Sequence, residues 1–472
     1  MSQQFKTIEA SQTKPIDFLQ TAKVRRRVLF VSGFFPPNAP MGAVRPGKLQ
    51  AHWNRQNHDV RTLAIKFDVE TASEQGPQAG VFYVPHHELG QSITAIKANI
   101  MRLLPLRSMQ SARRMNSNGG NGAPDGPANH QSFFDVAEIY RQVLLFPDRY
   151  RSWVAPAVEL GASWAPQWVP DIIYSSGPPH SSHLVAERLA RRLGVPWIAE
   201  LRDLWADNPY EDRHPILRPF LERLARRTLA SAQACVAVTS CAQKALQQIT
   251  SRPVALSYNG YDPADFSELG RTEPFDPKRL TIVHAGVIYP GRRDPGPLFE
   301  AISQLGARRA EIRCLFYHDE TNSVRDLAAR YGVESSVEIK DRVARAEILQ
   351  IERAVDVLLE CRWRDPTGDG VIPGKLFEYI GARRPILSLG SLTGEAAEIV
   401  RTNGLGLASN DPDEIKQQLL KWLDEKARTG RLSDLPSRID DQFCRRAQFE
   451  KIDALIESQC PPARSARALN AS

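Results

Sequence analysis

The stretch GVIPGKLFEYIGARRPIL, residues 370–387, decides the fold, because it has the pattern of a helix start followed by a strand that returns to a sheet. Pro373 suits the first turn of a helix, and Gly374 lets the backbone approach a ligand closely. The unpaired amides of that turn and the helix dipole favour an anion, to which Lys375 adds a positive charge. A short apolar run then begins at Pro385. The stretch predicts a phosphate-facing helix within an α/β domain.

Glu378 lies one helical turn after Lys375 and shares roughly one helix face with it. A carboxylate at that place can accept hydrogen bonds from two adjacent hydroxyls of a sugar. An amphipathic surface helix is the alternative interpretation, because Leu376, Phe377 and Ile380 have the spacing of a core-facing stripe. The stretch alone leaves both interpretations open, and the rest of the chain favours the first.

The length and composition are those of a soluble enzyme with two domains. A chain of 472 residues is longer than one hydrophobic core usually covers, and 42% of its residues are hydrophobic. No apolar run approaches the length of a membrane span, and the polar start of the chain lacks the apolar centre of a signal peptide. We therefore expect a cytoplasmic protein.

The charge and the cysteine content limit the kinds of partner and cofactor that we expect. The formal charge of +7 predicts an anionic partner, such as a phosphorylated small molecule, a lipid headgroup or nucleic acid. The basic residues are spread over loops and helix faces rather than clustered with stacking aromatics, which argues against nucleic acid. The six cysteines form no CxxC pair, so neither a zinc site nor a disulfide framework is expected. We expect no metal and no other cofactor.

The first half of the chain alternates strand and helix patterns after a polar tail, residues 1–23, that we expect to be disordered. The predicted strands are Val28–Ser32, 60–65, 171–175, 196–201, 232–238 and 254–257, with helices over 46–56 and 182–193. A glycine- and proline-rich loop connects the first strand to the first helix. This order predicts a doubly wound, Rossmann-like parallel sheet over residues 24–268.

A basic amphipathic stretch interrupts this half at residues 91–115. Its isoleucines and leucines are interleaved with lysine and arginine, and a Gly/Asn/Pro-rich linker follows to residue 130. We predict that residues from about 91 to 130 form a mobile insert. Two interpretations of the basic stretch stay open: a solvated helix face, and a segment that contacts a membrane surface.

A second alternating series begins at Leu280 and predicts another Rossmann-like domain, residues 275–428. Its predicted strands are 280–284, 311–317, 337–339 and 355–359, and its predicted helices lie near 298–305, 324–331 and 344–354. Residues 429–472 are predicted to form a C-terminal helix and tail. Two doubly wound α/β domains that face each other across a cleft follow from this order, with the boundary near 265–278.

Six stretches carry a family resemblance. They are FFPPNAPMGAVRPGK (34–48), PDIIYSSGPPHSSH (170–183), GVPWIAELRDLWADNPY (194–210), ALSYNGYDPADF (255–266), HAGVIYPGRRDP (284–295) and GKLFEYIGARRPIL (374–387). Together they resemble glycosyltransferases of the GT-B fold, family 4, in the branch that serves bacterial surface polysaccharide synthesis. Each stretch alone is a weak signal, but the six follow the family's order over roughly residues 26–425. The resemblance implies transfer of a sugar from a nucleotide-sugar to a hydroxyl.

The resemblance also implies how the second domain holds the donor. A metal-free site must stabilise the leaving diphosphate with cations and helix-terminal amides, and the candidates are Arg292, Arg293 and Lys375. Arg293 is the favoured member of its pair. Gly42 resembles the glycine whose backbone approaches the diphosphate from the first domain, although an ordinary turn glycine is the alternative interpretation. The remaining donor candidates are Gly286, Gly374 and Glu378, the last of which binds the nucleotide ribose in the family.

The acceptor candidates come from loops of the first domain. Asp203, His180 and His183 follow predicted strands, at the edge where parallel sheets bind ligands, and they are the candidate catalytic residues. Their role is to orient hydroxyls and balance charge. The candidate acceptor-binding residues are Arg45, Asp148 and Trp153. A capping or solvated histidine and a core tryptophan are the alternative interpretations.

The first of the two glutamates in the family's pattern is missing. Gly370 occupies its place, and the segment that precedes Glu378 is longer than the pattern. Asp365, Asp369 and the backbone amides of residues 371–374 are the candidates to replace it.

We therefore predict a retaining glycosyltransferase that acts in the cytoplasm, peripherally at the inner face of the cell membrane, on a lipid-linked saccharide or oligosaccharide acceptor. A non-catalytic nucleotide-sugar-binding or scaffold protein is the alternative, since the first glutamate is absent. An epimerase or sugar phosphatase would use the same nucleotide site without an acceptor. A dinucleotide oxidoreductase would need a compact G-x-G-x-x-G turn, which neither glycine-containing loop has. The sequence does not determine the nucleotide base, the sugar, the linkage, the acceptor or the oligomeric state.

Overall fold

The computed structural model describes residues 25–37, 40–67, 80–87, 142–206, 214–267, 275–288, 292–317, 322–365, 368–436 and 439–460. The predicted N-terminal tail, the predicted insert at about 91–130 and the last twelve residues of the predicted C-terminal tail, 461–472, lie outside these residues.

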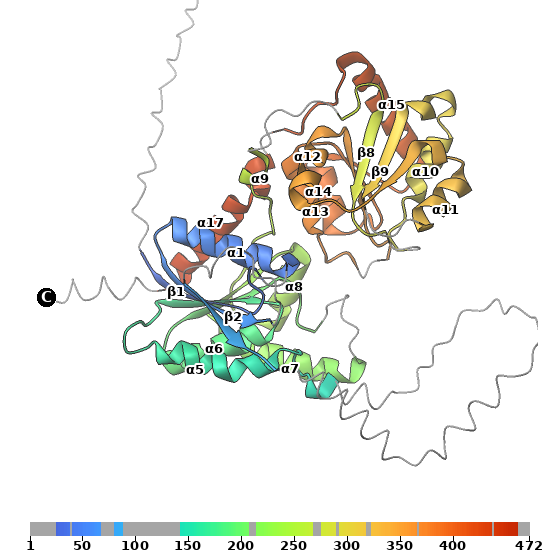
Figure 1. Cartoon of the computed structure of the whole chain (residues 1–472). Coiled ribbons are helices and arrows are strands. Elements are labelled where there is room, and N and C mark those ends of the chain that lie inside the picture. Colours follow the sequence, from blue (N-terminus) through green and yellow to red (C-terminus); the bar gives the residue numbers. More distant parts are fainter. Residues whose placement is uncertain are drawn as a thin grey trace, which may run out of the picture.

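The first domain contains a seven-stranded parallel sheet with the strand order β3-β2-β1-β4-β5-β6-β7 (Figure 1). Its strands are β1 (Arg27–Ser32), β2 (Asp59–Lys66), β3 (Val81–Pro85), β4 (Ile172–Gly177), β5 (Trp197–Leu201), β6 (Ala234–Ala237) and β7 (Val254–Leu256). The central strands β4 and β5 are buried at every position, which is typical of a parallel sheet covered on both faces. The predicted doubly wound sheet is therefore confirmed, with β3 as an edge strand that the sequence pattern missed.

Helices cover both faces of this sheet. The helices are α1 (Pro40–Arg55), α5 (Val154–Ser163), α6 (Ser181–Leu193), α7 (Arg218–Leu229) and α8 (Ser240–Ile249), with the short α9 (Ala264–Ser267) after the last strand. The C-terminal helix α17 (Arg445–Gln459) returns to the first domain, where Phe449 and Ile452 pack with Trp53 of α1 against the sheet. In Figure 1, α1 and α17 lie on one side of the sheet and α5, α6 and α7 on the other.

Helix α1 begins at Pro40, six residues before the predicted start, and it contains Pro46. A proline inside a helix has no N–H to donate to the carbonyl four residues earlier, which here is that of Gly42. The Gly42 carbonyl instead accepts a hydrogen bond from the Arg202 guanidinium. A side chain from another loop thus replaces the lost backbone bond, which lets the helix start at Pro40.

The second domain contains a six-stranded parallel sheet with the order β10-β9-β8-β11-β12-β13. Its strands are β8 (Leu280–Ala285), β9 (Ile312–Tyr317), β10 (Val337–Lys340), β11 (Val357–Cys361), β12 (Ile386–Leu389) and β13 (Gly406–Ala408). Its helices are α10 (Gly296–Ser303), α11 (Asn322–Tyr331), α12 (Arg345–Ala354), α13 (Gly374–Ala382), α14 (Glu395–Thr402) and α15 (Pro412–Thr429), with the short α16 (Asp440–Phe443) leading into α17. The second predicted Rossmann-like sheet is confirmed.

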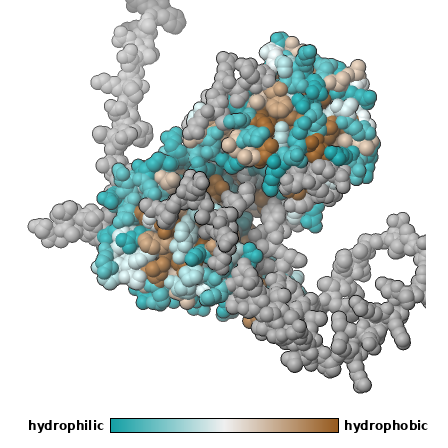
Figure 2. Space-filling view, viewed as in Figure 1, coloured by the Kyte–Doolittle hydropathy of each residue, from teal (hydrophilic) through white to brown (hydrophobic). Residues whose placement is uncertain are grey.

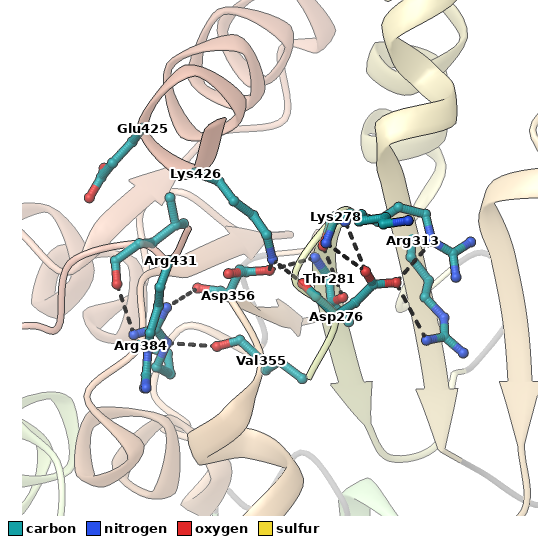
Figure 3. Close-up of polar contacts among 12 residues, drawn as sticks. Asp276, Lys278, Thr281, Arg313, Val355, Asp356, Arg384, Glu425, Lys426 and Arg431 are labelled. Atoms are coloured by element: carbon teal, nitrogen blue, oxygen red, sulfur yellow. Dashed lines mark hydrogen bonds and ion pairs between the residues drawn. The ribbon is translucent and has the colours of Figure 1, made fainter. Parts of the chain in front are cut away.

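A buried ion pair joins α15 to the start of β8 and the residue before β11 (Figure 3). Lys426 Nζ lies 2.5 Å from Asp356 Oδ2, and the two side chains are 4% and 3% exposed. Asp356 Oδ2 also accepts from the backbone amide of Thr281, at 2.8 Å. Because this cluster lies at the amino ends of the strands, it holds the second sheet and α15 together at the end opposite the expected ligand edge.

We expect Lys426→Met to lower the free energy of unfolding by about 2–3 kcal/mol, measured by urea denaturation. Removing one partner of a buried pair leaves a charge without its counterion, which usually costs about 3–5 kcal/mol. The cost should be smaller here because Asp356 keeps the Thr281 amide. Lys416→Met, on the exposed side of the same helix, is the control and should change stability by less than about 0.5 kcal/mol. Equal effects of the two substitutions would contradict the role of the pair.

The face of the molecule in Figure 2 is predominantly hydrophilic, with apolar residues gathered in a few places. Within the described ranges, no helix combines the length and the apolar character that crossing a bilayer requires. All six cysteines lie among the described residues and are free thiols: Cys241 is exposed and the other five are buried.

Candidate functional site

Helix α13 starts with its backbone amides open to a ligand. Pro373 is the N-cap residue in an extended conformation, and no side chain caps the helix. Gly374, the first helical residue, is exposed, and a Cβ built on it would meet no atom within 4 Å. The Leu376 amide donates to the Pro373 carbonyl at 3.0 Å, and the amides of Gly374 and Lys375 lie at the positive end of the helix dipole, where a ligand can accept from them. The segment therefore has the geometry of an anion site. Leu376 and Phe377 are buried, which the alternative interpretation as an amphipathic helix also requires.

Lys375 lies directly over Gly286, the residue that follows β8. A Cβ built on Gly286 would be only 1.7 Å from Lys375 Nζ, and Gly286 has φ +146°, a conformation that favours glycine. The absence of a side chain at this position thus makes room for the ammonium group. Burial lowers the pKa of Lys375, and the nearby positive charge of Arg293 lowers it further. A bound dianion would relieve this repulsion.

The two adjacent arginines have different surroundings. The guanidinium of Arg292 stacks on the ring of Trp363, 4.7 Å from its centroid. Arg293 forms an isolated antiparallel bridge with Trp363 and donates to the Val287 carbonyl at 3.3 Å. Because the charge of Arg293 helps to lower the pKa of Lys375, whereas the Arg292 guanidinium stacks on Trp363, Arg293 stays the favoured member of the pair.

Glu378 is engaged by a residue that the sequence analysis did not single out. Arg345, at the start of α12, lies 2.9 Å from Glu378 Oε1 and 2.9 Å from Asp265 Oδ2. Lys48 of α1 forms ion pairs with Asp262 and Asp265. A chain of alternating charges therefore runs from the first domain to the predicted ribose carboxylate. No sequence signal marks Arg345, because its partners are distant along the chain.

Glu352 of α12 is a second residue that the sequence analysis missed. It is 1% exposed, and its Oε2 has no hydrogen-bond partner among the described residues. Burial raises the pKa of Glu352 well above its ordinary value, and the negative charge of Glu378 raises it further, whereas Lys375 opposes the shift. Burial thus favours the protonated form of the Glu352 carboxyl group, and the charge of Lys375 acts against it.

On the first-domain side, Gly42 lies in the first turn of α1. A Cβ there would approach the Phe34 ring to 2.8 Å, so the close packing of this ring requires glycine. Arg202 donates to the carbonyls of Gly42 and Pro178. It therefore ties the start of α1 to the loop that follows β4.

Arg45 is buried, and its donors are occupied within the first domain. Its Nε and Nη2 donate to Glu200 Oε1 at 2.9 and 2.7 Å, and its Nη1 donates to the Tyr258 carbonyl at 2.6 Å. Ser257 accepts from the same guanidinium. This geometry gives Arg45 a structural role and does not support the predicted contact with an acceptor.

The two candidate histidines lie beneath the loop that follows β4. His180 is 1% exposed and stacks on Trp205 with ring centroids 5.1 Å apart. His183 is fully buried, and its Nδ1 lies 2.9 Å from Ser175 Oγ. A Cβ on Gly177 would clash with both rings. The sequence predicted loop residues at the ligand-facing end of the strands, but the two histidines lie at the start of α6, where both rings are buried.

Burial lowers the pKa of His183 to about 3, and the charge of Arg202 also lowers it, against the effect of Glu200. His183 is therefore neutral at physiological pH and does not supply a proton there. Because its folded pKa lies below the unfolded value of about 6.5, the unfolded state binds the proton first as the pH falls, so acid destabilises the fold.

We expect His183→Gln to reduce the loss of stability between pH 6.5 and pH 5 by about 1.5 kcal/mol, because glutamine does not titrate in this range. Urea denaturation of both proteins at the two pH values measures the difference. An unchanged acid dependence would show that His183 does not titrate with the shift inferred from its burial.

The other acceptor candidates have mixed surroundings. Asp148 Oδ2 accepts from the Ser181 amide at 2.7 Å and so binds the start of α6, while its Oδ1 accepts from the Tyr150 amide. Trp153 is fully buried and donates to Ser181 Oγ at 2.9 Å, as its alternative interpretation as a core anchor requires. Asp203 is partly exposed just after β5 and remains the most accessible of the candidate catalytic residues.

The carboxyl edges of the two sheets meet at Glu395, the first residue of α14. Its Oε2 accepts from the Ser240 amide at the start of α8, at 2.7 Å, and its Oε1 accepts from Tyr258 Oη at 2.6 Å. A carboxylate at a helix N-terminus is favoured by the exposed amides and the dipole. A residue of the second domain thus contacts the first domain directly.

The loop in the place of the missing glutamate lies at the same contact. Asp369 accepts from Thr393 Oγ1 at 2.7 Å, and its carbonyl accepts from the Glu395 amide at 3.4 Å. A Cβ on Gly370 would lie 3.2 Å from Cys241 Sγ of the first domain. The close approach of the two domains leaves little room for a larger side chain at Gly370. Asp365, the other proposed substitute, lies four residues earlier in this loop.

Comparisons with known proteins agree with the two-domain architecture. The family model described as a glycosyl transferase 4-like domain matches residues 42–260. A search of curated proteins found no match to this chain. Among solved structures, HepE of Anabaena in complex with UDP and glucose aligns with 92% of this chain and 100% of its own, at 16% identity and a TM-score of 0.55.

Two further solved structures are similar. A glycosyltransferase from Rickettsia africae covers 92% of this chain and 98% of its own, at 12% identity and a TM-score of 0.54. The lipopolysaccharide outer core galactosyltransferase WaaB, in its apo form, covers 92% of this chain and 99% of its own, at 12% identity and a TM-score of 0.53. At these identities the likeness shows the fold, which is the predicted GT-B arrangement of two Rossmann-like domains.

Proposed function

We propose that this chain, which has the two-domain fold of GT-B glycosyltransferases, transfers a sugar from a nucleotide-sugar donor to a hydroxyl of an acceptor. The observation that carries the proposal is the position of the Lys375 ammonium, over the space that Gly286 leaves free, on a helix that starts with open amides at Gly374. The positive charge of Arg293 also acts on Lys375. Two cations and a helix N-terminus at the carboxyl edge of a parallel sheet are suited to a diphosphate.

These residues have a direct role in the proposed reaction. When the bond between the sugar and the diphosphate breaks, negative charge grows on the leaving phosphate oxygen. Lys375 and Arg293 stabilise that charge, and the α13 amides donate to the other phosphate oxygens. The cations present can supply this charge, so we propose that transfer does not depend on a metal ion. When the donor binds, its ribose hydroxyls donate to the Glu378 carboxylate, either in place of Arg345 or together with it.

The finer assignments rest on the family resemblance and the similar structures. HepE is described with UDP and glucose, and WaaB as a lipopolysaccharide galactosyltransferase, which supports a nucleotide-sugar donor and a saccharide acceptor in surface polysaccharide synthesis. We propose a retaining reaction and a lipid-linked acceptor, bound on the first-domain side near Asp203. The protein would then work peripherally at the inner face of the cell membrane.

A non-catalytic nucleotide-sugar-binding protein is the second candidate. Gly370 in place of the first glutamate favours it, and Cys241 Sγ, 3.2 Å from a Cβ built on Gly370, leaves little room for a larger side chain there. The paired cations at Lys375 and Arg293 favour catalysis, because binding alone does not need charge placed at the leaving oxygen.

The test is a titration of the purified full chain with UDP-, GDP-, ADP- and dTDP-sugars in the presence of a chelator. Thermal stabilisation reports binding, and release of the nucleoside diphosphate reports turnover. Stabilisation by one donor with release of its diphosphate supports the transferase. Binding without release, also in the presence of lipid-linked acceptors, favours the non-catalytic candidate, and no binding rejects the site.

In the same titration, we expect Glu378→Ala to weaken donor binding roughly 10- to 100-fold, since hydrogen bonds to a charged group contribute about 1.5–3 kcal/mol. Glu334→Ala, an exposed glutamate elsewhere in the second domain, is the matched control and should leave the affinity unchanged. Unchanged affinity in Glu378→Ala would reject the ribose role without affecting the assignment of Lys375.

A further inference from the structure

A patch of apolar side chains is exposed at the start of α7. Five large apolar side chains are at least 36% exposed in the described ranges, and three of them are Val143, Ile216 and Phe220, at 47%, 56% and 60%. Gln142 Oε1 accepts from the His214 amide at 2.8 Å, and Phe146 packs with Leu221 of α7. These contacts bring the segment that carries Val143 next to the segment that carries Ile216 and Phe220.

Arginines surround this apolar patch. Phe220, Arg223 and Arg227 are spaced as one stripe of α7, and Ile216 lies in the 3-10 turn (Pro215–Leu217) that leads into this helix. Exposed apolar residues at the start of α7 are therefore followed by two cations on its outer face. Residues 142–153 and 214–229 together contain six arginines against two carboxylates, for a net charge of +4. One carboxylate, Asp148, points inward to backbone amides. We call Val143, Ile216, Phe220, Arg218, Arg223 and Arg227 the α7 tip.

The α7 tip lies next to the acceptor side of the proposed site. The inner face of α7 packs Leu221 and Ala225 against Trp205, and Trp205 stacks on His180 at the start of α6. Asp203 lies two residues before Trp205. A partner held at the tip is therefore one layer of side chains away from the loop that we assign to the acceptor.

We propose that the α7 tip binds an anionic membrane surface, with the apolar side chains inserted at the headgroup boundary and the arginines against the lipid phosphates. Apolar side chains beside a row of cations fit the interface of a bilayer that carries negative charge. A second copy of the chain fits less well, because a symmetric contact would place like charges together and three apolar side chains are too few for a stable protein interface.

This inference deepens the proposed function, since a lipid-linked acceptor would be presented at the same surface. It is independent of the basic stretch 91–115, which lies outside the described residues. It also assigns vesicle binding to residues that are remote from the nucleotide site, so the two proposals are tested separately.

The experiment measures partition of the full chain onto sedimented vesicles of phosphatidylglycerol and phosphatidylcholine, and onto vesicles of phosphatidylcholine alone. We expect binding to the anionic vesicles, which salt weakens, and at least a tenfold lower partition coefficient for Ile216→Ser/Phe220→Ser and for Arg223→Gln/Arg227→Gln. Arg325→Gln/Arg330→Gln, on the exposed face of α11 in the second domain, removes the same charge and should retain wild-type partition.

Three results would overturn the inference. Wild-type partition of both α7 variants would show that another segment binds the membrane, and an equal loss in the α11 variant would show that only net charge matters. A wild-type dimer that dissociates in the α7 variants, with unchanged vesicle binding, would assign the tip to a second copy. Stabilisation by the nucleotide-sugar, measured on the same samples, verifies that the variants are folded. Vesicle binding without any nucleotide binding would reject the proposed function but leave the α7 tip assigned.

Discussion

Arg293→Ala should lower kcat/KM for the donor roughly 10³-fold, since removing one donor that stabilises transition-state charge costs about 10²–10³ in rate. Its charge lowers the pKa of Lys375, and the Lys375 ammonium lies over Gly286. In the proposed reaction, Arg293 and Lys375 share the charge of the leaving diphosphate. The measurement is the initial rate of diphosphate release at subsaturating donor, with the responsive nucleotide-sugar from the titration.

The neighbouring residue is the control for this prediction. Arg292→Ala should lower kcat/KM less than tenfold, because the Arg292 guanidinium stacks on Trp363, an exposed contact that contributes about 0.5–1 kcal/mol. Equal losses in the two variants would contradict the different roles assigned to the pair. A greater loss in Arg292→Ala would reverse the assignment.

Local sequence patterns predicted the part of the site that depends on local structure. The α13 start follows from Pro373 and Gly374, which set a helix N-terminus whatever lies around it, and β12 follows from the apolar run after Pro385. Alternating strand and helix patterns likewise predicted both sheets, because parallel strands buried on two faces need continuous apolar runs. The predicted start of α1 was wrong because the hydrogen bond that replaces the one lost at Pro46 comes from Arg202, 160 residues away from Gly42 along the chain.

Tertiary packing decides the rest, and the sequence carries no signal for it. His180 and His183 follow a strand, as ligand-binding residues do, but Gly177 allows the loop to pack down on both rings. Arg45 belongs to a stretch of sequence that resembles the family, yet its guanidinium forms an ion pair with Glu200 on β5. Arg345 and Glu395 contact Asp265 and Ser240, which are distant from them along the chain, so only the structure identifies these two residues. Residues that act through contacts between domains cannot be found from spacing along one segment.

Gly286→Ala should reduce donor kcat/KM roughly 10²- to 10³-fold, which is comparable to removing Lys375 itself. A methyl group at this position would lie 1.7 Å from Lys375 Nζ, so the ammonium must move away from the space that we assign to the diphosphate. The backbone at φ +146° adds strain for any residue with a Cβ. Kinetics of Gly286→Ala, Lys375→Met and the double variant form a cycle that measures the coupling of the two positions.

Gly306→Ala separates displacement of the ammonium from backbone strain. Gly306 also has a positive φ, +60°, but a Cβ there meets no atom within 4 Å. We expect it to cost about 1 kcal/mol of stability and to leave kcat/KM unchanged. If Gly286 acts by making room for Lys375, the double variant should lose little more than Lys375→Met alone, because the ammonium that the methyl group displaces is already absent. Losses that multiply in the double variant would instead show that the alanine harms the site independently of Lys375.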